Sequence, residues 1–230
     1  MHRFFVEPAA MIGDRFPVPQ EIAHQVTRVL RLRDGDAIAL LDGAGGQARC
    51  RLVDGACVVE ARGPADGEPR HRLTVWQALL RGDHLEPVVR HGTEVGVARF
   101  ALMTTERCIA RDMSPRRLER LRAVAREAAE QSERGIVPQV EAALPFAEVL
   151  VGAVPGAVLL FERDRGVRLS EVGTPPAVFI GPEGGFSADE VGAARDAGMV
   201  IAGLGPRILR SETVAVAVAA VILSRAGDFA

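Results

Sequence analysis

The fold class of this 230-residue chain is decided by residues 177–187, which read AVFIGPEGGFS. The first four residues form an apolar run typical of a buried strand, and the glycines that follow break it. Ser187 and Glu190, three residues further on, make the capping box of a helix. The stretch therefore predicts a strand, a glycine-rich loop and a helix. Such loops at the carboxyl ends of parallel strands are where open α/β sheets bind ligands.

A second stretch repeats this arrangement. Residues 199–213 read MVIAGLGPRILRSET, with an apolar run, a glycine-bearing loop and then the alanine-rich stretch 213–223, which favours a buried helix. Two such loops in one domain predict one shared pocket, where glycines let backbone amides approach a ligand closely. The alternative for residues 184–187 is a plain turn from strand to helix.

The remaining pattern predicts an α/β domain preceded by a small, mostly β unit. Strands are expected at 73–80, 97–103, 156–161, 177–181 and 199–204, and helices near 84–94 and at 115–132, 188–197 and 213–223. Ser114 is the expected N-cap of the second helix, and Gly135 its expected stop.

The first 62 residues predict a helix at 20–33, a hairpin of strands 36–41 and 48–53, and a further strand at 56–61. Glycines 43, 45 and 46 lie in the hairpin turn, and they lack the GK[ST] ending of a phosphate loop. The Gly- and Pro-rich stretch 63–69 predicts a linker, which divides the chain into domains 1–68 and 69–230.

Composition restricts the function classes. The net charge of −2 gives no global nucleic-acid signal, so an RNA-binding surface has to be local. All 28 basic residues are arginine, which favours either phosphate recognition or the codon bias of a GC-rich genome. Three cysteines without CxxC spacing and an N-terminus without the apolar core of a signal peptide predict a cytoplasmic protein. We expect neither a membrane span nor a metal site.

Five stretches together resemble one known family. The strings GPEGGFSADE at 181–190 and LGPRILRSET at 204–213 are similar to signatures of the RsmE-type 16S rRNA (uridine-N3) methyltransferases of the SPOUT superfamily. Residues 93–97 (TEVGV), 127–134 (EAAEQSER) and 24–31 (HQVTRVLR) resemble three further family segments, the last in its PUA-like domain. The resemblance spans nearly the whole chain.

The resemblance implies a homodimeric S-adenosylmethionine-dependent methyltransferase that acts in ribosome biogenesis, on N3 of a uridine in 16S rRNA of the small ribosomal subunit. It implies a C-terminal SPOUT-like parallel sheet with a trefoil knot, preceded by a small PUA-like β-barrel domain that binds RNA. It also implies a cofactor site made by three loops: Leu160, Phe161 and Glu162; Ile180, Gly181, Pro182, Glu183, Gly184 and Gly185; and Leu204, Gly205, Ile208, Leu209, Arg210, Ser211 and Thr213.

Methylation of an imide nitrogen requires that its proton leaves. Arg210 is the first catalytic candidate, because its permanent charge can stabilise a uridine anion or hold a phosphate. Glu183 and Glu212 are candidate bases or orienting groups, and each could equally pair with an arginine or cap a helix. The residues we favour for RNA contact, each equally open to interpretation as an ordinary surface residue, are Arg3, His24, Arg28, Arg31, Arg107, Arg111 and Arg134.

Two other functions fit the same sequence. One is a different SPOUT enzyme, acting on tRNA or on a ribose 2′-hydroxyl. The other is a non-catalytic RNA-binding factor of ribosome assembly with a degenerate pocket, against which the intact Arg210, Glu212 and glycine loops argue.

Overall fold

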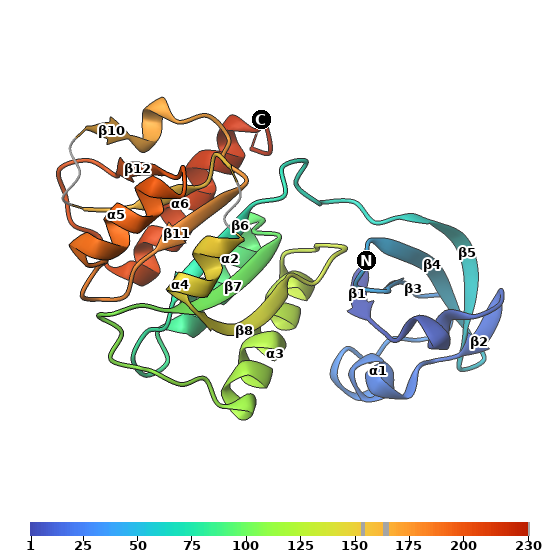
Figure 1. Ribbon diagram of the computed structural model, residues 1–230. Coiled ribbons are helices and arrows are strands. Elements are labelled where there is room, and N and C mark those ends of the chain that lie inside the picture. Colours follow the sequence, from blue (N-terminus) through green and yellow to red (C-terminus); the bar gives the residue numbers. More distant parts are fainter. Residues whose placement is uncertain (153–154, 163–165, 230) are drawn as a thin grey trace. The chain divides into compact units, whose positions relative to one another are not determined.

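The computed structural model of the chain describes residues 1–152, 155–162 and 166–229 (Figure 1). The chain forms two compact units, and residues 1–68 together with 129–137 make up the first. Residues 69–128 and 138–230 make up the second. Residues 129–137 thus belong to the first unit although both neighbouring stretches of sequence belong to the second. A single boundary in the sequence therefore cannot separate the two units.

The first unit is built on a five-stranded sheet with the order β1-β3-β4-β5-β2. Its strands are β1 (His2–Phe5), β2 (Arg15–Pro17), β3 (Ala37–Leu41), β4 (Gly46–Val53) and β5 (Ala56–Pro64). β1 pairs with β3 in parallel, and the other pairs are antiparallel. A buried apolar core that includes Phe4, Leu40 and Leu52 holds this sheet together. Phe5 and Leu41 pack with Ala129 and Val137, which attaches the returning segment.

The predicted β3–β4 hairpin is confirmed. The Asp42 carboxylate accepts hydrogen bonds from the backbone amides of Ala44 and Gly46, both at 2.8 Å. The amides of this glycine-rich turn therefore serve the turn itself.

The helix predicted at 20–33 is shorter and less regular than expected. After a 3₁₀ turn at Pro8–Met11, α1 covers Gln20–His24 and passes into a π-helical turn at Gln25–Val29. The Thr27 hydroxyl donates to the Ala23 carbonyl at 2.7 Å, a bond that competes with regular helix geometry. Arg31, with a φ of 53°, then ends the helical path in the left-handed region.

The second unit is an α/β domain with a seven-stranded sheet in the order β10-β12-β9-β11-β6-β7-β8, in which every pair is parallel. The strands are β6 (Thr74–Ala78), β7 (Arg99–Thr104), β8 (Gln139–Pro145), β9 (Val158–Leu160), β10 (Val167–Arg168), β11 (Ala177–Ile180) and β12 (Val200–Gly203). The helices are α2 (Leu85–Val95), α3 (Pro115–Gln131), α4 (Phe146–Val151), α5 (Ala188–Asp196) and α6 (Ser211–Arg225), with a 3₁₀ turn at Leu169–Glu171. The predicted parallel α/β sheet is confirmed, and the trefoil knot stays a prediction.

Helices cover both faces of this sheet. Trp76 of β6 stacks on Phe179 of β11 with ring centroids 5.6 Å apart, and Phe146 of α4 meets the edge of Phe179. The next residue, Gln77, points to the opposite face and donates a hydrogen bond to Ser211 of α6. Strand alternation therefore places α4 on one face and α6 on the other.

The local signals at the helix ends gave mixed results. The capping box of α5 is confirmed, because the Ser187 hydroxyl accepts from the Glu190 amide at 3.3 Å and the Glu190 carboxylate accepts from the Ser187 amide at 2.9 Å. Ser114 caps α3 through the Arg117 amide at 3.2 Å, as predicted. The predicted stop at Gly135 is wrong: α3 ends at Gln131, and Glu133 takes the left-handed conformation with a φ of 59°.

A glycine inside α2 provides a stability prediction. A Cβ added to Gly92 would lie 2.7 Å from Cε1 of the buried Phe100 ring. We expect Gly92→Ala to lower the free energy of unfolding by about 1–3 kcal/mol, because overpacking exceeds the gain in helix propensity. The control is Gly192→Ala in α5, where an added Cβ meets no described atom within 4 Å. It should raise that free energy by about 0.5–1 kcal/mol in the same urea unfolding series, and equal losses in both variants would contradict the overpacking argument.

Candidate active site

Three of the predicted loops leave neighbouring strands at one edge of the sheet. β9 lies between β12 and β11, and all three run parallel, so their carboxyl ends share that edge. Leu160 ends β9 and is followed by Phe161 and Glu162, while residues 163–165 lie outside the described part of the chain. The segment 181–187 follows β11, and residues 204–210 follow β12 and lead into α6.

Close packing shapes the loop after β11 and brings it beside the loop after β9. A Cβ on Gly181 would lie 3.2 Å from the carbonyl carbon of Gly185. Gly185 has a φ of 69°, and a Cβ there would lie 3.2 Å from a carboxylate oxygen of Glu162. The left-handed backbone therefore favours glycine at position 185, and the close approach of the Gly185 backbone leaves little room for a side chain at position 181.

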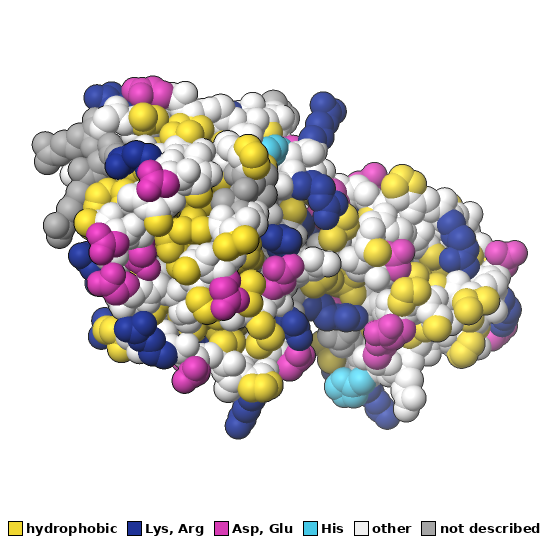
Figure 2. Space-filling model, viewed as in Figure 1, with side chains coloured by type: hydrophobic (Ala, Val, Ile, Leu, Met, Phe, Trp, Pro, Cys, Tyr) yellow, Lys and Arg dark blue, Asp and Glu magenta, His cyan; other side chains and the backbone are white. Residues whose placement is uncertain are grey.

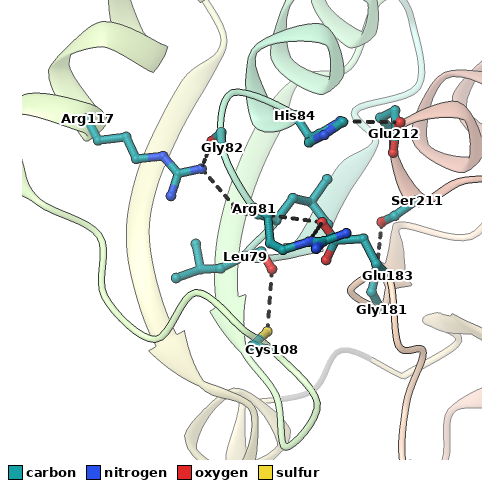
Figure 3. Close-up of polar contacts among 11 residues, drawn as sticks. Leu79, Arg81, Gly82, His84, Cys108, Arg117, Gly181, Glu183, Ser211 and Glu212 are labelled. Atoms are coloured by element: carbon teal, nitrogen blue, oxygen red, sulfur yellow. Dashed lines mark hydrogen bonds and ion pairs between the residues drawn. The ribbon is translucent and has the colours of Figure 1, made fainter.

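A buried relay joins the third loop to the second. The Gln77 side-chain amide donates to the Ser211 hydroxyl at 2.9 Å, and that hydroxyl donates to the Gly181 carbonyl at 2.6 Å. Gln77 lies at the end of β6, so the relay connects β6, the loop after β11 and the first residue of α6 (Figure 3 shows its Ser211–Gly181 part). The Gln77 side-chain oxygen is buried without a hydrogen-bond partner among the described residues.

Ser211 therefore provides a prediction for cofactor binding. Ser211→Ala removes the donor to the Gly181 carbonyl and the acceptor for the Gln77 amide, both of them buried. We expect the affinity for S-adenosylmethionine to fall about tenfold, because the loop of residues 181–187, released from Ser211, has to be ordered again when the cofactor binds. Calorimetric titration of the variant measures this loss. Ser224→Ala, at an exposed position of the same helix, is the matched control and should bind like the unchanged protein. An unchanged affinity in Ser211→Ala would show that the relay does not contribute to cofactor binding.

Glu183 is held by the loop that follows β6. Its carboxylate accepts a hydrogen bond from the Arg81 backbone amide at 3.0 Å and lies 3.6 Å from the Arg81 guanidinium (Figure 3). Partial burial raises the pKa of Glu183, but the backbone amides of Arg81 and of Glu183 itself and the charges of Arg81 and His84 outweigh this effect. The pKa of Glu183 therefore lies below its ordinary value, which makes this carboxylate a poor proton acceptor at neutral pH.

Glu212 and Arg210 lie at the start of α6. A carboxylate oxygen of Glu212 lies 3.4 Å from Nδ1 of His84 (Figure 3), and the Glu212 side chain is largely buried. Arg210 is the N-cap residue of α6, and its carbonyl accepts from the Thr213 and Val214 amides, both at 2.9 Å. Within the described part of the chain its exposed guanidinium makes no hydrogen bond or ion pair, so it is available to a ligand.

The sequence reasoning missed the loop of residues 79–84, which contributes Arg81 and His84. Arg117 of α3 donates to the carbonyls of Leu80 at 2.9 Å and Gly82 at 2.5 Å, and the Cys108 thiol donates to the Leu79 carbonyl at 3.5 Å (Figure 3). These bonds hold the loop in one conformation. A signal was present, because residues 81–84 follow the carboxyl end of a predicted strand, as the two glycine loops do.

The other predicted cofactor residues follow the same loops. Leu160, Ile180 and Pro182 are buried, and Leu204 and Leu209 are half-buried. Gly184 receives a hydrogen bond on its carbonyl from the Arg107 guanidinium at 3.1 Å. Gly205 has a φ of 105°, Thr213 is exposed, and Ile208 is 81% exposed.

The predicted RNA-contacting residues fall into two groups. In the first unit His24, Arg28 and Arg31 are exposed, while Arg3 is half-buried and donates to the Glu133 carbonyl at 3.0 Å. In the second unit Arg107 and Arg111 are exposed, and Arg111 donates to the carbonyls of Thr105 and Glu106. Figure 2 shows basic and acidic side chains interspersed over the second unit, in agreement with the small net charge.

Arg134 needs a correction. Its side chain is only 3% exposed and pairs with Glu68 at 2.8 Å. The same carboxylate accepts from the backbone amides of Gly135 at 3.0 Å and Ile136 at 2.9 Å. Arg134 therefore holds the returning segment 129–137 to the rest of the first unit, and it presents no free guanidinium to RNA.

Two absences concern the described residues alone. Within that part of the chain, no helix is long and apolar enough to cross a membrane. The same residues contain no group of three or more His, Cys, Asp or Glu side chains that could hold a metal ion.

Comparisons with known proteins agree with this arrangement. Residues 67–223 match the family model described as RNA methyltransferase domain, and residues 18–58 match that of the RNA methyltransferase PUA domain. The chain is 34% identical to ribosomal RNA small subunit methyltransferase E of Synechocystis, covering 92% of this chain and 74% of that protein. It is 33% identical to the protein of the same name from Mycobacterium bovis, covering 92% and 87%. The crystal structure of the Neisseria gonorrhoeae protein of this name, bound to S-adenosyl methionine, has a TM-score of 0.86 at 29% identity over 97% of each chain.

The fold and the matched domains define a two-part RNA methyltransferase, in which a PUA domain precedes a parallel α/β sheet. Within that class, the chain belongs to the family of ribosomal RNA small subunit methyltransferase E. The resemblance of the sequence to this family is thereby confirmed, together with the PUA-like and SPOUT-like fold.

Proposed function

We propose that this protein transfers the methyl group of S-adenosylmethionine to N3 of a uridine in 16S rRNA of the small ribosomal subunit. The observation that carries the proposal is the convergence of the loops after β9, β11 and β12 at one sheet edge, where Glu162 lies close to Gly185 and the Gln77–Ser211–Gly181 relay links the last two loops. The family and the cofactor-bound relative from Neisseria gonorrhoeae support it.

The residues at this edge fit the cofactor. Gly181 and Gly185 bring bare backbone to the pocket, and Leu204, Ile208 and Leu209 offer apolar contacts to an adenosine. The unsatisfied Gln77 oxygen is a buried acceptor beside these loops, as expected of a site that binds a ligand with hydrogen-bond donors. When bound, S-adenosylmethionine supplies a sulfonium methyl group that an imide nitrogen can attack in line.

The charged residues divide the remaining work. The Arg210 guanidinium is unpaired within the described chain and stabilises the negative charge that develops on the uracil as its N3 proton leaves. Glu212, held by His84, accepts that proton. Glu183 orients the loop of residues 79–84 through Arg81, because its lowered pKa suits an ion-pairing role better than that of a base. Positioning of the two reactants supplies much of the acceleration.

RNA contact is assigned to the residues that the sequence predicts for it, with the exception of Arg134. Arg28, Arg31 and His24 of the first unit are exposed, as are Arg107 and Arg111 of the second. The target base is unstacked before reaction, because N3 lies on its pairing edge.

The decisive experiment incubates the protein with methyl-labelled cofactor and small subunits from a strain that lacks the modification. Label recovered as N3-methyluridine supports the proposal. Label on tRNA or on a ribose hydroxyl would assign the chain to another SPOUT reaction. Absence of label together with absence of cofactor binding by calorimetry would identify a non-catalytic RNA-binding factor.

A homodimer in the cytoplasm completes the proposal. The apolar character of α6 does not by itself support a dimer, because Ala215, Val218, Ile222 and Leu223 are buried within the second unit. The assembly therefore rests on the family resemblance, and analytical ultracentrifugation at several protein concentrations tests it.

A further inference from the structure

The first unit contains a cavity of about 190 Å³. Arg3 and Phe4 of β1, Gln25, Val29 and Leu30 of the helical segment, and Glu130 are among the residues that line it. Pockets for drug-sized ligands measure roughly 300–1,000 Å³. This smaller cavity therefore suits one flat fragment about the size of a single nucleobase.

The backbone beside the cavity is irregular in two ways. Gln25–Val29 form a π-helical turn, and Arg31 two residues later has a φ of 53°. π-helical turns are rare, and a non-glycine residue in the left-handed region is unfavourable, and both occur preferentially at functional sites. Val29, the last residue of the π-helical turn, lines the cavity and is 62% exposed. A ligand that covers this aliphatic side chain removes apolar surface from water, which favours binding.

Two exposed arginines near the cavity in the sequence can bind phosphate groups. Arg28 and Arg31 are exposed and make no ion pair within the described part of the chain. Two of the nearby acids are engaged by backbone amides: Glu21 accepts from the Glu7 amide at 2.9 Å and Asp36 from the Arg33 amide at 2.7 Å. These carboxylates keep their negative charge, so the attraction for RNA comes from the two unpaired guanidinium groups themselves, which can form bidentate bonds with phosphates.

Polar groups on the cavity wall complement the edge of a base. The Gln25 side-chain amide donates and accepts, whereas the Glu130 carboxylate accepts only. Arg3 contributes a guanidinium that Glu133 already orients, with Nε 3.4 Å from its carboxylate. A base edge that presents an N–H donor beside carbonyl acceptors, as that of uracil does, fits this mixed set of groups, and Val29 and Leu30 supply apolar surface for its face.

We infer that this cavity binds one unstacked nucleobase of single-stranded RNA, while Arg28 and Arg31 contact the flanking phosphates. The inference rests on the proposed function, since it specifies how the first unit recognises the RNA that the second unit methylates. It adds a base-binding subsite beside residues that the sequence predicts only for RNA contact in general.

Binding of labelled oligouridylate and of duplex RNA of equal length, followed by fluorescence anisotropy in the full-length protein, tests the inference. Gln25→Ala should weaken single-strand binding about five- to tenfold, the value of one or two hydrogen bonds, and leave duplex binding unchanged. Arg28→Ala should weaken binding to both RNAs and lower the salt dependence by about one phosphate contact. Gln20→Ala, an exposed glutamine on the same helical segment, is the matched control and should change neither.

Two results would overturn the inference: Gln25→Ala behaving like Gln20→Ala, or losing equal affinity for both RNAs. Because Gln25 is exposed, unchanged thermal unfolding of the variant is expected and excludes misfolding as a cause. Failure here leaves the N3-methyluridine signal of the unchanged protein intact. Failure of the proposed function removes that signal whatever the RNA affinity.

Discussion

Replacement of Arg210 by alanine is expected to reduce methyl transfer about 100-fold or more while the affinity for S-adenosylmethionine stays nearly unchanged. The guanidinium is exposed at the N-cap of α6, next to the Ser211 relay, and the described residues give it no partner. Its charge is therefore available to the anion that forms as the N3 proton leaves, and removing one such preorganised donor typically costs about 10²–10³ in rate. Single-turnover transfer to small subunits measures the rate, and calorimetry measures the affinity.

The matched control is Arg207→Ala. Arg207 lies in the same loop and is exposed, and the described residues pair it with no acidic side chain either. Its loss changes the charge of the loop equally but leaves the start of α6 intact, so we expect an effect of about threefold or less. Equal losses of rate and cofactor affinity in Arg210→Ala would move that residue from the chemistry to cofactor binding. Equal losses of rate in Arg210→Ala and Arg207→Ala would show that both arginines act only through the overall charge of the loop.

The parts of this structure that local sequence determines could be predicted. The AVFIGPEGGFS stretch predicts a strand, a loop and a capped helix, because apolar runs, glycines and capping residues act over a few positions. The same holds for the β3–β4 hairpin and its Asp42 turn. β8 escaped prediction because Gln139–Pro145 is an edge strand with a half-exposed, mostly small or polar sequence and no continuous apolar run.

The polar links within the candidate site could not be predicted, because each joins residues far apart in the chain. The Arg81–Glu183, His84–Glu212 and Gln77–Ser211 contacts all span more than 100 positions. Sequence reasoning named Glu183 and Glu212 as candidate bases or orienting groups but could not rank them. Their different roles depend on partners that only the fold provides, and the structure separates an ion-paired carboxylate with a lowered pKa from one that faces a histidine.

The interpretation of Arg134 failed for the same reason, and its correction leads to a large expected effect on stability. The guanidinium donates two hydrogen bonds to Glu68, at 2.8 and 3.2 Å, across 66 positions of sequence. Breaking a buried pair costs about 3–5 kcal/mol, because it leaves a buried charge without its partner. Glu68 is 21% exposed and keeps two backbone amides, so we expect Arg134→Ala to cost about 3 kcal/mol.

Hydrogen exchange of the β3, β4 and β5 amides measures this loss, because the affected contacts lie in the first unit. Arg28→Ala is the control, since its exposed and unpaired side chain should change the unfolding free energy by no more than about 0.5 kcal/mol. The effects on RNA binding should be the reverse of the effects on stability. Arg28→Ala should weaken RNA binding, and folded Arg134→Ala should not. If Arg134→Ala instead weakened RNA binding at unchanged stability, Arg134 would return to the RNA-contacting residues, and the Glu68 pair would be incidental to the attachment of the returning segment.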